Sequence, residues 1–248
     1  MHPLFILSAV LQIACAIHVL RTGRPMYWIF LLLIGSYIAI AVYFFAEIMP
    51  GLGNSPTGRK ALGSAHDRID PDRHRRKAAL QLDVADTSRN RQALAEESLR
   101  SGDFQKAEQL YRSALTGLYR TDPNLMLGLA QAQFGLQQPQ QARDTLDALI
   151  AANPTFRTHE GHLLYARAVE ASGDIPKALE EYEAVVVGFP GEEARVRYAQ
   201  LLKHAGQAAK ARELLNESLK RADLAPAFYR REQRPWLDLA KRELQNTD

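Results

Sequence analysis

A spacing between small side chains recurs four times after residue 87 and limits what this chain can fold into. Within a frame of 34 residues, an alanine falls at position 8, a second alanine at position 20 and a large residue at position 24. Small residues at these places let two paired helices approach closely where they cross. One pair cannot bury its apolar face alone, so successive pairs must stack. The spacing therefore predicts an all-α array of helical pairs, an α-solenoid.

The four copies cover about 88–121, 123–156, 159–192 and 192–225. Their frame positions are occupied by Ala95, Ala107 and Tyr111, by Ala130, Ala142 and Leu146, by Ala166, Ala178 and Tyr182, and by Ala199, Ala211 and Leu215. This pattern resembles the tetratricopeptide repeat, and the resemblance covers about 140 residues. Two positions depart from that family. Repeat two has Gln137 where glycine usually makes the turn, and repeat four has Asp223 where proline usually ends the second helix.

The repeat pattern stops after residue 225, and the remaining residues suit a cap. Segments 226–233 and 235–245 are typical of one broken helix or two short helices. An apolar stripe on the second segment consists of Trp236, Leu237, Leu239 and Leu244. A solenoid needs a terminal element with a polar outer face to close its last apolar surface. We therefore expect a C-terminal capping helix; a basic helix that binds a partner is the alternative.

Residues 1–50 differ sharply from the rest, since their only charged side chains are Arg21, Arg24 and Glu47. Apolar runs of 17 and 24 residues cover 4–20 and 26–49, and the short link between them contains glycine and proline. About 20 apolar residues in a helix span the hydrocarbon core of a bilayer. The pattern predicts a two-helix transmembrane hairpin. A cleaved signal peptide is the alternative, but no lysine or arginine precedes the first run.

The segments at the two ends of the apolar run 26–49 resemble a known type of membrane anchor. The sequences RPMYW at 24–28 and YFFAEIMP at 43–50 are similar to the N-terminal membrane hairpin of cardiolipin synthases and related phospholipase D-like proteins. The catalytic half of that family carries His-x-Lys-x4-Asp. That motif is absent here, because His74 is followed by Arg75, Arg76 and Lys77 with no aspartate in register. The resemblance covers about a fifth of the chain and implies a membrane anchor without phosphatidyl transfer.

Basic residues predict the orientation of this hairpin. The link carries two, whereas residues 51–85 carry seven lysines and arginines against four aspartates. Basic segments stay on the cytoplasmic side, so both termini are expected in the cytoplasm and the chain in a bacterial-type inner membrane as a multi-pass protein. We interpret 51–86 as a flexible basic linker with a short helix at about 70–85, and 87–248 as the capped solenoid. The linker also suits anionic lipid headgroups; a topogenic charge cluster is the alternative.

Motifs for catalysis, metals and cofactors are missing from the sequence. The single cysteine excludes an intramolecular disulfide and a multi-cysteine zinc site. There is no phosphate-binding glycine loop and no nucleophile elbow. His159 and His162 lack a nearby third ligand, so we expect solvated residues at a helix start. Residues 86–248 carry 22 basic and 23 acidic side chains, which argues against nucleic acid as a partner. We expect neither an enzyme nor a cofactor.

The remaining candidate site is the concave face that the repeat resemblance implies. In a tetratricopeptide array, positions 2, 5, 9 and 12 of the first helix of each repeat point inward. The predicted binding groove therefore consists of Arg89, Gln92, Glu96, Asn124, Leu127, Gln131, Phe134, Arg167, Glu170, Gln200 and Lys203. Arginine and amide side chains can hold the backbone and carboxylates of an extended peptide. The alternative is that these residues are merely the polar side of amphipathic helices.

Two functions remain open at this stage. The first is a membrane-anchored scaffold whose groove recruits a protein partner or peptide to the cytoplasmic face of the membrane. The second is a non-catalytic regulatory subunit of a lipid or envelope biogenesis enzyme, contacted through the hairpin. Binding that survives deletion of the hairpin favours the first, and binding that requires the hairpin favours the second.

Overall fold

A computed structural model of the chain describes residues 3–23, 25–34, 36–48 and 70–245. The chain divides into two compact units, Met1–Arg73 and His74–Asp248. Both units are helical in the part described, as the sequence predicts. Most of the segment predicted as a flexible linker, 51–69, lies outside the described residues.

The first unit is a helical hairpin. Helix α1 (Pro3–Thr22) is followed by α2 (Tyr27–Ile34), α3 (Ser36–Tyr43) and a short π-helix, η1 (Phe44–Ile48). The first helix packs against the next two through a small buried core of Cys15, Val19, Trp28, Leu32, Ala39 and Tyr43. Within the described residues, no helix combines the length and the apolar character needed to cross a membrane.

The second unit begins with α6 (Arg73–Val84), the short helix expected in the linker. It lies before the boundary predicted at residue 87 and packs on the first repeat. Ala78 is 5% exposed and belongs to the same buried cluster as Leu94 and Ala95, and Leu82 packs against that cluster. These apolar contacts fix α6 to the first repeat, so the array begins near His74.

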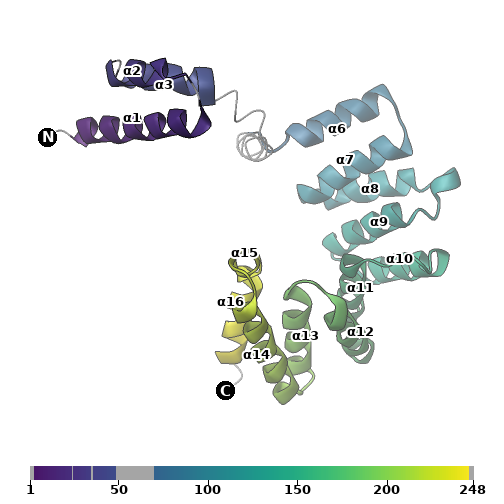
Figure 1. Cartoon of the computed structure of the whole chain (residues 1–248). Coiled ribbons are helices and arrows are strands. Elements are labelled where there is room, and N and C mark those ends of the chain that lie inside the picture. The colour runs from purple at the N-terminus through teal and green to yellow at the C-terminus, as the bar shows by residue number, and fades with distance from the viewer. Residues whose placement is uncertain (1–2, 24, 35, 49–69, 246–248) are drawn as a thin grey trace. The chain divides into compact units, whose positions relative to one another are not determined.

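Four antiparallel helical pairs follow α6, one for each predicted repeat (Figure 1). They are α7 (Ser88–Arg100) with α8 (Phe104–Ala114), α9 (Pro123–Gly135) with α10 (Pro139–Ala152), α11 (His159–Ala171) with α12 (Ile175–Gly188), and α13 (Glu193–His204) with α14 (Ala208–Leu224). A 3-10 turn, η2 (Gly117–Tyr119), joins the first pair to the second. Each helix packs against the next one in the sequence, so the predicted solenoid is confirmed.

Side chains in front of the helices fix where the first three pairs begin. The side-chain oxygens of Thr87, Asp122 and Thr158 accept hydrogen bonds from backbone amides in the first turns of α7, α9 and α11. An N-cap of this kind satisfies amides that have no partner within the helix. The caps set the register in which each first helix presents its inner face.

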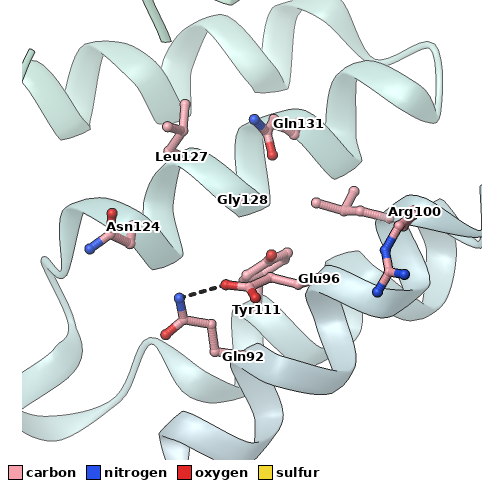
Figure 2. Close-up of a pocket in the computed structure, with 9 residues that line it drawn as sticks. Gln92, Glu96, Arg100, Tyr111, Asn124, Leu127, Gly128 and Gln131 are labelled. Atoms are coloured by element: carbon pink, nitrogen blue, oxygen red, sulfur yellow. Dashed lines mark hydrogen bonds between the residues drawn. The ribbon is translucent and has the colours of Figure 1, made fainter. Parts of the chain in front are cut away.

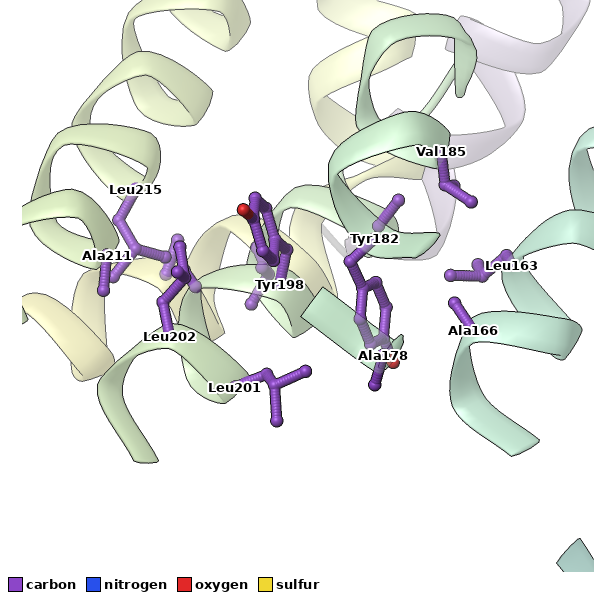
Figure 3. Close-up of a cluster of buried hydrophobic side chains, with 14 of the residues drawn as sticks. Leu163, Ala166, Ala178, Tyr182, Val185, Tyr198, Leu201, Leu202, Ala211 and Leu215 are labelled. Atoms are coloured by element: carbon purple, nitrogen blue, oxygen red, sulfur yellow. The ribbon is translucent and has the colours of Figure 1, made fainter. Parts of the chain in front are cut away.

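The frame positions form the core of the array. The alanines at positions 8 and 20 are at most 1% exposed in all four repeats, and the large residues at position 24 are at most 2% exposed. Figure 3 shows Tyr182 of this set beside Ala178, with Tyr198 of the next repeat facing it. The two tyrosine rings are stacked with their centroids 6.1 Å apart. Small residues thus bring the helices together, and the large residue fills the next interface.

The predicted turn position is in the left-handed conformation in every repeat. Glycine fills it at Gly102, Gly173 and Gly206, with φ between +77° and +88°. Gln137 takes the same role with φ of +60° and is the only non-glycine residue with positive φ in the described part of the chain. The left-handed region is unfavourable for a residue with a Cβ. Repeat two therefore keeps the geometry of the turn despite its sequence.

Two helices close the array after repeat four. They are α15 (Ala227–Glu232) and α16 (Arg234–Gln245). Ala240 is fully buried, and Trp236 and Leu239 pack against the core of repeats three and four. The predicted cap and its apolar stripe are confirmed.

Candidate functional site

The open part of the predicted groove lies between α7 and α9 (Figure 2). A pocket of about 450 Å³ is present there. Residues predicted from the repeat frame line it: Gln92, Glu96, Asn124, Leu127 and Gln131. Leu99, Arg100, Tyr111 and Gly128 complete the lining. We call this site the α7–α9 pocket.

Tyr111 and Gly128 bring the two walls of this pocket together. A Cβ at Gly128 would lie 2.3 Å from Cζ of Tyr111, so the ring can lie against α9 only because this residue is glycine. Burial and the nearby Glu96 carboxylate raise the pKa of Tyr111, which keeps the phenol neutral. Gly128 is not among the residues predicted from the repeat frame. Its signal was a glycine inside a predicted helix, which often marks a close contact.

The polar groups of the α7–α9 pocket suit a peptide backbone. Nε2 of Gln92 donates a hydrogen bond to Oε1 of Glu96 over 2.9 Å. The side chains of Asn124 and Gln131 are exposed and make no hydrogen bond to another described residue. An amide side chain both donates and accepts, as a peptide group requires of its partner. Arg89 is exposed in the first turn of α7 and lies outside the pocket lining.

Arg167 does not behave as the free groove cation that its repeat position predicts. Its guanidinium carbon lies 4.7 Å from the centroid of the Phe134 ring, and its Nη1 lies 4.0 Å from Oε1 of Glu193. Burial and the neighbouring Arg197 lower the pKa of this guanidinium. A cation over an aromatic face with a carboxylate beside it is already satisfied. Arg167 and Phe134 therefore hold neighbouring repeats together.

The same arrangement continues to the end of the array. Nε of Arg197 donates to Oε1 of Glu193 over 2.8 Å, and its guanidinium carbon lies 4.9 Å from the ring centroid of Trp236. The continuous row that results, from α9 to α16, contains Phe134, Arg167, Glu193, Arg197 and Trp236. We call it the concave row. Glu193 compensates one of the two arginine charges, and an aromatic ring lies against each guanidinium, so both arginines already have partners within the chain.

The cap engages both predicted groove residues of repeat four. Nε2 of Gln200 donates to Oε1 of Glu243 over 2.8 Å, and Nζ of Lys203 donates to Oε2 over 3.2 Å. Glu243 belongs to α16, so the chain itself covers this end of the groove. Glu170 is likewise engaged, because the hydroxyl of Tyr182 donates to its Oε2 over 2.6 Å. The repeat frame could not reveal the contacts of Gln200 and Lys203 with Glu243, since it contains no information about the cap.

A second cavity of about 720 Å³ was not predicted from the sequence. It lies between repeats two and three and is lined by residues of α10, α11, α12 and the segment 153–158. His159 and His162 both line it, and Nε2 of His162 lies 3.0 Å from Oε2 of Glu181. The hydroxyl of Tyr165 donates to Asp147, and burial with this bond raises the pKa of Tyr165 to about 12. These contacts stabilise the wall of the cavity.

Comparisons with known proteins agree with the repeat geometry. Two family models of tetratricopeptide repeats match, one over residues 98–168 and the other over residues 163–227. A comparison with curated proteins found no significant match.

Two solved structures are similar to the array. One is a thermophilic tetratricopeptide repeat protein of Thermus thermophilus, which is 19% identical with a TM-score of 0.51; the match covers 68% of this chain and 86% of that one. The other contains nearly identical tetratricopeptide-like repeats from Podosopora anserina, 22% identical with a TM-score of 0.50, over 64% of this chain and 84% of that one. These matches show the fold alone.

Proposed function

Residues 98–227 are tetratricopeptide repeats, and on this premise we propose that the chain is a non-catalytic scaffold whose concave face binds a segment of a partner protein. The observation that carries the proposal is the α7–α9 pocket. It is the part of the predicted groove that the protein's own side chains leave open. Extended concave surfaces of repeat arrays are suited to such binding.

The pocket favours an extended peptide that lies across repeats one and two. Asn124 and Gln131 supply amide donors and acceptors for its backbone, and Leu99 and Leu127 supply apolar contact for a side chain. Glu96 offers a carboxylate to a basic residue of the peptide. Towards repeat four the concave row and Glu243 have already satisfied the groove residues. The bound segment is therefore expected to end before α13.

We also propose that the first unit attaches this scaffold to a membrane. Large apolar side chains point outward along its helices, with exposures between 48% and 78%: Val10, Ile13, Ile17, Leu20, Phe30, Leu33, Ile38 and Val42. An exposed apolar surface of this extent is typical of a protein that contacts lipid or another protein. The resemblance of the hairpin to membrane anchors of cardiolipin synthases supports lipid.

The polar groups of the first unit support the same proposal, because they pair inside the hairpin. Nε2 of Gln12 donates to the Leu32 carbonyl over 2.9 Å, and Nδ1 of His18 lies 2.8 Å from the Tyr43 hydroxyl. Nε1 of Trp28 donates to Oε1 of Glu47 over 3.1 Å. Within lipid, polar groups must find partners in the protein. The charge bias then favours cytoplasmic termini and a bacterial-type inner membrane.

A site-specific crosslink tests the binding proposal. A photo-crosslinking residue at position 131 of the full chain is expected to capture a partner in living cells, and the same residue at position 220 on α14 is not. Asn124→Arg, which places a long side chain across the α7–α9 pocket, is expected to remove the adduct at position 131. Equal adducts at 131 and 220, or adducts that survive Asn124→Arg, would overturn the groove proposal.

Membrane attachment has a separate test. The full chain is expected to stay in the membrane pellet after carbonate extraction, with reporters fused at residue 60 and residue 248 both reading cytoplasm. Release of the chain into the carbonate supernatant would contradict the anchor. A reporter that reads the opposite side would contradict the orientation alone.

A further inference from the structure

The cavity between repeats two and three is a second site, separate from the α7–α9 pocket. Residues of α10, α11, α12 and the loop 153–158 line it, and Leu127 of α9 is the one residue that both sites share. Its volume of about 720 Å³ lies within the range of roughly 300–1,000 Å³ that is typical of small-molecule sites. We call it the α10–α12 cavity.

Hydrogen bonds hold the loop between α10 and α11, which forms one end of the cavity. Nδ2 of Asn153 donates to the Thr121 carbonyl over 3.0 Å and to the Leu149 carbonyl over 3.3 Å. The Phe156 amide donates to the Asn153 carbonyl over 3.0 Å, and the Thr158 side chain caps α11. The cavity is therefore built into the fold and does not depend on a ligand to shape it.

The buried part of the lining is apolar. Leu146, Leu149 and Val185 are each at most 4% exposed, and Phe156 is half-buried. Ile150 extends this surface towards solvent with 49% exposure. The apolar side chains of α10 span about two helical turns, roughly 11 Å. This length suits an aliphatic chain of about eight to ten carbons, since a C–C bond is about 1.5 Å long.

A peptide backbone would find few partners in this cavity. Asn153 carries the only amide side chain among the described residues that line it, and its Nδ2 is engaged within the fold. The α7–α9 pocket differs, because Asn124 and Gln131 are free there. Main-chain hydrogen bonds supply much of the affinity for an extended peptide. The α10–α12 cavity therefore favours a ligand without a peptide backbone.

The charges of the lining favour an anionic group on that ligand. Glu181 pairs with Lys177 at 3.0 Å, and Asp147 accepts a hydrogen bond from a tyrosine hydroxyl. Arg157 is exposed and makes no ion pair within the described residues. Glu160, in the first turn of α11, neither lines the cavity nor pairs with Arg157. Of the charged side chains in the lining, the Arg157 guanidinium is the one still open to a counter-charge.

We propose that the α10–α12 cavity binds an aliphatic carboxylate. Its alkyl chain lies against Leu146, Leu149 and Val185, where burial of each methylene adds to affinity. Its carboxylate meets the guanidinium of Arg157, which can donate two parallel N–H bonds to the two oxygens. His159 lines the same end of the cavity and can donate a further bond. Such a ligand contacts repeats two and three together and adds a function that is independent of the peptide groove.

Photo-crosslinking to the full chain tests the inference. The probe is decanoate with a diazirine in the middle of its chain, and adducts are mapped by mass spectrometry after proteolysis. Adducts are expected on peptides of α10 and α12. Ala184→Trp, which fills the cavity from an exposed position of its lining, is expected to reduce these adducts about tenfold or more. The matched control Val187→Trp, on the same helix but outside the lining, is expected to leave them unchanged.

The head group has its own comparison. Excess decanoate is expected to displace the probe from the cavity, and excess decanol is not. Arg157→Gln is expected to lower the adduct yield about fivefold or more, whereas Arg120→Gln, an exposed arginine outside the lining, is expected to have no effect.

Three results would overturn the inference. Adducts confined to the first unit, or unchanged by Ala184→Trp, would show partition onto apolar surface without a site. Displacement by decanol as strong as that by decanoate would overturn the assignment of a carboxylate. A photo-crosslinking residue at position 184 that captures a protein in living cells would overturn it in favour of a protein interface. None of these results bears on the α7–α9 pocket, which is tested at position 131.

Discussion

At the scale of the residue, Gln137 shows how strongly the array enforces its geometry. It adopts φ of +60° at the turn where the other repeats have glycine. The flanking turn is closed like the others, with the Gln138 amide donating to the Gln133 carbonyl over 3.0 Å. The packing of α9 against α10 therefore holds a residue in a conformation that its own preferences oppose.

Gln137→Gly is expected to stabilise the array. The left-handed conformation costs a residue with a Cβ about 1–2 kcal/mol in the folded state, and glycine relieves this strain. Glycine also raises the conformational entropy of the unfolded chain, which lowers the unfolding free energy by roughly 0.5–1 kcal/mol. The net gain in unfolding free energy is expected to be about 0.5–1 kcal/mol, measured by urea denaturation. The control Ala148→Gly, at an exposed position in the interior of α10, is expected to cost about 1 kcal/mol. A loss of stability in Gln137→Gly would show that the strain is absent.

Tyr182 makes two kinds of contact. Its buried ring fills the interface between repeats three and four, and its hydroxyl donates a hydrogen bond to the predicted groove residue Glu170. Tyr182→Ala is expected to cost roughly 3–5 kcal/mol, and Tyr182→Phe only about 1–2 kcal/mol through the lost hydrogen bond. Coupling in a repeat array runs between neighbours. Hydrogen exchange is therefore expected to rise in repeats three and four more than in repeat one. An equal rise in all four repeats would contradict this coupling.

At the scale of the element, the sequence predicted the helices better than the free surface of the groove. Period, alanine spacing and turn residues depend on contacts within and between repeats, and each repeat carries them in its own residues. The α7–α9 pocket followed from the same frame. Arg167, Gln200 and Lys203 make contacts within the chain that the frame did not predict, because their partners Phe134, Glu193 and Glu243 come from other elements. No spacing within a repeat encodes those contacts.

The stability of the cap is expected to depend on pH, because α16 contacts the groove through the Glu243 carboxylate. Hydrogen bonds from Gln200 and Lys203 hold the pKa of Glu243 below its ordinary value of 4.5. A carboxyl with a lowered folded-state pKa stabilises the fold above its unfolded pKa, and this contribution is lost as pH falls through the folded value. Hydrogen-exchange protection of α16 is therefore expected to fall below about pH 4.5. Glu243→Gln should show less protection at neutral pH and little further change on acidification; an unaltered acid transition in this variant would exclude Glu243 as its source.

At the scale of the whole molecule, the two units contribute different surfaces. The first presents apolar side chains outward and keeps its polar pairs inside. The second buries the alanine frame and leaves open the pocket between α7 and α9. Sequence composition predicted this division, since nearly all charged residues follow residue 50. It could not reveal that α6 belongs to the array, because that depends on the contact of Ala78 with the first repeat.

We propose that a partner binds in the α7–α9 pocket and that its bound segment ends before the cap. Hydrogen exchange of the full chain, with and without the partner captured at position 131, is the sharpest test of this binding mode. Added protection is expected in α7 and α9, abolished by Asn124→Arg and unaffected by Lys220→Glu on α14, with α13 and α16 unchanged. Protection centred on α13, or confined to the first unit, would contradict it.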